Sequence, residues 1–154
     1  MRSLDLVQMI EQILSENEFR ILELQKDQLY AGLSSDGKNL RLSILDDPYF
    51  KTRKQAQAYS DKKDTQHARD EGSIFKKRDK GIPNLIVTGS LVYDRIFVKT
   101  ESGRLIIDVN TPILSDLKQK YGEFLGLSPQ ACSYVTETII YPQLKVMVYE
   151  HLKG

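Results

Sequence analysis

The sequence has one cysteine, two histidines and no tryptophan in 154 residues. With Cys132 alone, an intramolecular disulfide is impossible, which fits a chain kept in a reducing compartment better than a secreted scaffold. His67 and His151 lack a second His or Cys at metal-ligand spacing, which argues against a zinc site. We expect Cys132 to act as a small hydrophobic residue on the apolar side of its helix.

Long apolar runs and glycine clusters are also missing. No stretch approaches the ~20 apolar residues that cross a bilayer, and the opening residues MRSLD do not lead into the apolar segment of a signal peptide. We therefore expect a soluble protein, made in a cytoplasm, without membrane contact. Gly89 and Gly103 stand apart from other glycines, so no phosphate-binding loop is indicated.

Carboxylate pairs are present, but each has a simpler explanation than catalysis. Asp46–Asp47 and Asp70–Glu71 fit helix capping and loop solvation, and an acid–base pair needs environments that separate the two pKa values. We therefore expect a protein that is not an enzyme and that holds no cofactor or metal.

The net charge of +1 conceals an uneven distribution. Residues 51–80 carry ten Lys or Arg against five Asp or Glu, a balance of +5, and the remaining residues sum to −4. A solvated helix followed by a mobile loop would explain this. The alternatives are head-to-tail docking of like subunits or limited contact with nucleic acid. The candidate contact residues are Lys76, Lys77, Arg78 and Lys80, which follow Phe75.

Local signals predict a single, helix-dominated α+β domain over residues 1–154. Residues 4–30 have helical apolar spacing, and the capping-box pattern from Ser15 to Glu18 predicts a second helix start or a bend there. Residues 40–50 alternate as in a short strand or an extended arm. Asp47–Pro48 predicts the start of a polar helix from Tyr49 to about Asp64. The predicted segments are an N-terminal helical part (2–31), a flexible basic loop (65–82), a β-hairpin region (85–109) and C-terminal helices (112–154).

The runs RIFVK (95–99) and RLIIDV (104–109), joined by residues 100–103, predict a small antiparallel hairpin. We expect Ile96, Val98 and Ile106 to face the core. A helix should follow from Thr111–Pro112 to Tyr121 and end at Gly122. Ser128–Pro129 predicts the start of another helix, which Pro142 should kink or interrupt.

The order of several segments resembles a known family. These are QLYAGLSSDGKNL (28–40), Tyr49-Phe50-Lys51, the basic loop, and KGIPNLIVTGSLVYDRIFV (80–98). Over about residues 20–127 this order is similar to tail-completion and head–tail joining proteins of tailed bacteriophages, including neck or ring proteins of crAss-like phages. The matching structural motif consists of Thr88, Gly89, Leu91 and Ile96, whereas Arg95 stands where the family usually has Ser.

The resemblance implies a structural virion protein, a subunit of a homo-oligomeric ring at the head–tail connector, neck or tail. Its partners would be other copies, connector, portal or tail proteins, with possible non-specific DNA contact. Two alternatives stay open. A small DNA-binding or host-interaction regulatory protein would use the basic segment as its working surface. A small enzyme would need a pocket with perturbed titratable groups, and the sequence indicates no candidate.

Overall fold

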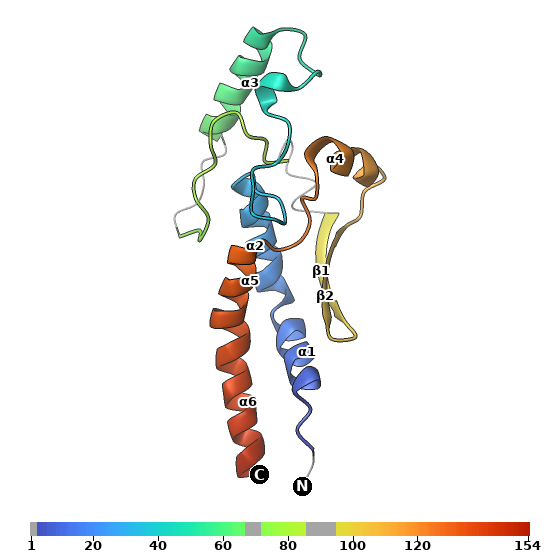
Figure 1. The fold of residues 1–154 in the computed structure, drawn as a ribbon, viewed down its shortest axis with the longest axis vertical. Helices are drawn as coiled ribbons and strands as arrows, with labels where there is room; N and C mark the ends of the chain where they lie inside the picture. The colour runs from blue at the N-terminus through green and yellow to red at the C-terminus, as the bar shows by residue number, and fades with distance from the viewer. Residues whose placement is uncertain (1–2, 67–71, 86–94) are drawn as a thin grey trace.

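The computed structural model describes residues 3–66, 72–85 and 95–154 (Figure 1). The protein is α+β and helix-dominated with a two-stranded antiparallel sheet, which confirms the predicted fold class. In Figure 1 the molecule is elongated, with α3 at one end and both termini at the other. The elements are α1 (Leu6–Glu16), α2 (Glu18–Tyr30), the 3-10 turn η1 (Ile44–Asp46), α3 (Arg53–Gln66), β1 (Ile96–Glu101), β2 (Arg104–Val109), α4 (Leu114–Tyr121), α5 (Pro129–Val135), the π-helical η3 (Thr136–Ile140) and α6 (Tyr141–Lys153).

The predicted break between two N-terminal helices is present, but not with the predicted cap. Ser15 lies inside α1, and Asn17 is the N-cap residue of α2. The Asn17 side chain instead donates a 2.7 Å hydrogen bond to the carbonyl of Ile13, in the preceding turn. The capping-box interpretation was therefore wrong, because α1 continues through the serine.

The segment 40–50 is not a strand. It is a loop that contains η1, and the Asp47 carboxylate accepts a 3.0 Å hydrogen bond from the backbone N–H of Tyr49. The predicted helix start at Asp47–Pro48 is also wrong. Helix α3 begins at Arg53, and the Thr52 hydroxyl accepts from the N–H of Gln55 at 3.2 Å, as an N-terminal cap does.

The hairpin is confirmed, with a two-residue turn at Ser102 and Gly103 whose φ angles are 51° and 72°. Such turns need positive φ at both positions and match the twist of paired strands. The expected position of Ile106 is wrong. It pairs with Lys99, whereas Ile107, opposite Val98, packs against the core. Side chains alternate between faces along a strand, so this error of one residue reverses the side on which Ile106 lies.

The helix start at Ser128–Pro129 is confirmed, since the Ser128 hydroxyl accepts from the N–H of Ala131 at 3.3 Å. The interruption predicted at Pro142 takes the form of the π-helical η3, which leads directly into α6. A π-helical turn lets a helix continue past a residue that has no N–H to donate. Figure 1 accordingly shows α5 and α6 as one rod, which lies beside α1.

The buried apolar side chains of the described residues form two clusters. The first joins α1, α2, Phe75 and the rod, and the second joins the end of α2, the hairpin and Phe124. The basic loop predicted over 65–82 starts too early, because α3 extends to Gln66, and residues 67–71 lie outside the described residues. Residues 72–82 have no helix or strand, as predicted, yet Phe75 is only 2% exposed and anchors them to the first cluster. Cys132 is exposed, contrary to expectation, because Ala131, Val135 and Ile139 form the buried face of the rod.

Candidate subunit-contact surfaces and a pocket

The basic segment, residues 76–80, is held at the surface by its neighbours. Phe75 is buried beside it, and Gln130 donates a 2.7 Å hydrogen bond to the carbonyl of Ile74. Lys76, Lys77 and Lys80 are exposed. Arg78 is half-buried, and its guanidinium donates to the carbonyl of Ile82. Three of the four candidate contact residues are thus available to a partner, whereas Arg78 also braces its own loop.

The residues on which the resemblance to phage connector proteins was based divide between two regions. Thr88, Gly89 and Leu91 lie outside the described residues. Ile96 is 5% exposed and belongs to the second core cluster, where it pairs with Val109. Ile96 therefore has a packing role within the subunit.

A group of apolar side chains is uncovered where α1 begins and α6 ends. Val7 is 66% exposed, and Leu4 and Leu6 lie near it in sequence at 39% and 46%. On α6, Val146, Tyr149 and Leu152 are 55%, 59% and 74% exposed. We call these six residues the terminal apolar surface. The helical apolar spacing of the sequence shows an apolar face, but not whether the chain itself covers that face.

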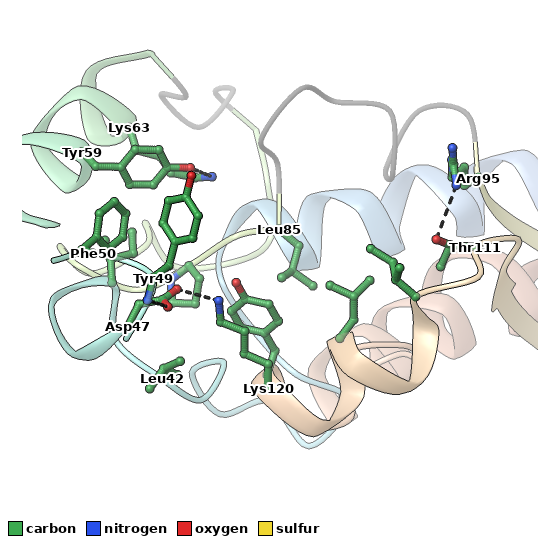
Figure 2. Close-up of a pocket in the computed structure, with 15 residues that line it drawn as sticks. Leu42, Asp47, Tyr49, Phe50, Tyr59, Lys63, Leu85, Arg95, Thr111 and Lys120 are labelled. Carbon is green, nitrogen blue, oxygen red and sulfur yellow. Dashed lines mark hydrogen bonds and ion pairs between the residues drawn. The ribbon is translucent and has the colours of Figure 1, made fainter. Parts of the chain in front are cut away.

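A pocket of about 500 Å³ lies between the loop at 42–50, α3, residues 83–85 and α4. Figure 2 shows Tyr59 and Lys63 at one end of it and Arg95 and Thr111 at the other. Its walls are mainly aliphatic and aromatic. They are formed by Leu42, Ile44, Tyr49, Phe50, Tyr59, Pro83, Leu85, Ile113, Leu117 and Tyr121.

Three of the four charged side chains that line the pocket are cationic. Lys120 and Asp47 form a 2.8 Å ion pair. Burial lowers the pKa of Lys120, but its hydrogen bonds to Asp47 and Tyr121 and the charges of these two groups together outweigh burial and raise that pKa. Lys63 is 6% exposed, and its amine lies 3.5 Å from the Tyr59 hydroxyl. Burial, with repulsion from Arg78, lowers the pKa of Lys63 to about 8. Burial also raises the pKa of Tyr59.

This pocket contains a perturbed titratable group that sequence reasoning missed. At neutral pH most Lys63 amines are protonated, and a cation with apolar neighbours attracts a carboxylate more strongly than one in water. Among the described residues that line the pocket, Asp47 is the acidic one, and it is paired with Lys120. The arrangement therefore favours binding an apolar group that carries a negative charge.

Across 3–66, 72–85 and 95–154, no three or more His, Cys, Asp or Glu side chains are grouped to hold a metal ion. None of the helices in those ranges is both long and apolar enough to span a membrane.

Comparisons with known proteins give no relative from which a function could be taken. The chain matches no protein family model, no curated protein and no solved structure.

Proposed function

We propose that this chain is a structural subunit of a homo-oligomeric ring in the connector, neck or tail of a tailed bacteriophage. The terminal apolar surface is the observation that carries the proposal. Val7, Tyr149 and Leu152 are each more than half exposed, on two helices that lie side by side. Exposed apolar side chains gathered at one end of a molecule favour a surface that partners cover, because burial removes them from water.

The charge distribution supports contact between like subunits. Residues 3–30 carry six acidic and two basic side chains. Residues 51–63 and 72–80 together carry nine basic and two acidic ones. A closed ring uses heterologous contacts, in which one face of a subunit meets a different face of the next. Acidic and basic regions at different places on one molecule suit such a contact.

The resemblance to connector proteins gives the assembly its proposed location, the virion. Neighbours would be portal, connector or tail proteins, and Lys76, Lys77 and Lys80 could add non-specific contact with DNA phosphates. A ring around a DNA channel needs only mild attraction, because tight binding would stop the DNA. In this proposal the chain is not an enzyme, and the pocket serves binding.

Particle composition tests this function. We expect mass spectrometry of purified particles, from a phage that encodes the chain, to detect it in several copies per particle. Immunogold labelling should place it at the junction of head and tail. A regulatory protein would instead be absent from purified particles, and the isolated chain would bind DNA with an affinity that falls steeply with salt. That pair of results would contradict the proposal.

A further inference from the structure

We propose that the start of α1 in one copy docks into the pocket between α3 and α4 of the next copy. The docking residues are Leu4, Asp5, Leu6 and Val7. This inference rests on the proposed function, and it identifies the two surfaces that meet when one subunit contacts the next.

The start of α1 combines apolar and acidic groups. Leu4, Leu6 and Val7 are exposed, and Asp5 between them is exposed as well. The Asp5 carboxylate caps the helix by accepting from the N–H of Gln8 at 3.0 Å. A carboxylate has several lone pairs, so this hydrogen bond leaves it able to accept from a partner.

The pocket has the complementary character. Its walls offer aliphatic and aromatic surface. Its volume of about 500 Å³ falls within the range of about 300–1,000 Å³ that is typical of ligand-binding pockets. Lys63 and Arg95 supply positive charge at its two ends (Figure 2). The half-buried Arg78 acts on Lys63 electrostatically, so the basic segment extends this positive region.

The shape of the molecule requires the two faces to come from different copies. In Figure 1 the start of α1 lies at the end with both termini, whereas α3 lies at the opposite end. A subunit therefore cannot place its own α1 in its own pocket. Repeating such a heterologous contact generates a ring if the rotation closes, and a filament if it does not.

Directed cross-linking tests the contact. In a Cys132→Ser background, which removes the exposed native thiol, separate proteins carry Val7→Cys or Tyr49→Cys. Tyr49 lines the pocket and is 81% exposed, so the change should leave the fold intact. After mixing and mild oxidation, we expect the Val7→Cys and Tyr49→Cys proteins to form a disulfide-linked heterodimer. One chain that carries both changes should form a ladder of oligomers.

Gln57→Cys provides the matched control, because Gln57 is exposed on α3 but does not line the pocket. We expect at least tenfold less heterodimer with Gln57→Cys than with Tyr49→Cys. Equal yields, no cross-linking at all, or preferred Val7→Cys homodimers would each overturn the docking. If the wild-type chain is nevertheless present at the neck of particles, the proposed function survives and only the docking fails.

Docking also predicts a loss of association. A double variant, Leu6→Ser and Val7→Ser, should keep the circular dichroism spectrum of the wild type, because both residues are exposed. It should weaken self-association by at least tenfold in analytical ultracentrifugation. The change Phe19→Ser is the control, since Phe19 is 73% exposed on α2. An unchanged association constant for the α1 variant would also overturn the proposal.

Discussion

Lys63 shows how burial controls the charge of one side chain. Both its alkyl stem and its amine lie in the pocket wall, beside Tyr59, and its pKa falls to about 8. The unfolded chain would hold this proton up to a pKa of about 10.4. Below pH 8 both states are protonated, and the folded state bears the full cost of the buried charge. As the pH rises from 8 to 10, that cost decreases, because the folded state releases its proton first.

Replacing Lys63 with Met tests this pH dependence. The variant should be more stable relative to wild type at pH 7 than at pH 10, because only the wild type gains stability as its amine deprotonates. Melting temperatures of both proteins at the two pH values measure the difference. The exposed Lys54→Met, on the same helix, should show no comparable change. A difference between wild type and Lys63→Met that does not vary with pH would contradict the low pKa.

Two buried glutamines hold the chain before α5. Gln28 donates 2.8 Å and 3.3 Å hydrogen bonds to the carbonyls of Gly126 and Ser34, and accepts from the N–H of Ser128 at 2.7 Å. Gln25 similarly accepts from the N–H of Gly126 at 2.9 Å. Buried polar groups are tolerated when they are fully paired, and both glutamines are 0% exposed.

The change Gln28→Leu should therefore be strongly destabilising. It keeps the approximate side-chain volume but leaves backbone groups unpaired, each at a cost of about 1–3 kcal/mol. Urea denaturation should show a large fall in midpoint. Gln57→Leu is the matched control, because its side chain is exposed and bonds only to exposed Asp61. Equal midpoints for the two variants would mean that the Gln28 hydrogen bonds contribute little.

At the scale of elements, the hairpin depends on α1 and α2 for one covered face. A two-stranded hairpin is marginally stable alone in water. Here Val98, Leu105 and Ile107 pack against the first cluster. The Glu18 carboxylate of α2 also accepts from the N–H of Thr100 at 2.7 Å. The face that includes Lys99 and Ile106 is not part of either core cluster.

Neighbouring isoleucines in β2 give a test of this register. Ile107→Asp should cost several kcal/mol, because it places an unpaired charge against both clusters. Ile106→Asp should cost much less, since that side chain faces away from them. Thermal unfolding followed by circular dichroism compares the two. A larger loss for Ile106→Asp would show that the strand pairs one residue out of the register described.

At the scale of the whole molecule, the apolar and acidic surfaces are separated from the basic one. The terminal apolar surface and the acidic α1 lie at the end of the molecule that holds both termini. The basic segment lies away from that end, close enough to the pocket for Arg78 to act on Lys63. Exposed charges contribute little to folding stability, but like charges across an interface cost several kcal/mol. Charge reversal can thus separate assembly from folding.

Reversing Lys76, Lys77 and Lys80 to Glu should abolish assembly and preserve the melting temperature within a few degrees. Arg78 is left unchanged because it bonds to the Ile82 carbonyl within the loop. The control reverses three lysines exposed elsewhere, Lys38, Lys99 and Lys145. Particle infectivity and light scattering of the purified chain report assembly. Normal, infectious particles with the first variant would exclude the basic segment from the contact.

Features set by a few adjacent residues were predictable from the sequence. Ser128 caps α5, Ser102–Gly103 turns the hairpin, and Gly122, with φ of 83°, ends α4. Each depends on backbone angles and hydrogen bonds within about four residues, so the local sequence contains the cause. The same local signals, taken in order along the chain, indicated a helix-dominated α+β protein.

Features that join distant segments were decided by the tertiary structure. Asp47 pairs with Lys120, 73 positions away, and α3 begins later than its local signal predicted. The face of Ile106, the exposure of Cys132 and the burial of Gln28 follow from which helices cover which surface. The pocket and the lowered pKa of Lys63 arise in the same way, because burial and local charge are set by neighbours that only folding brings together.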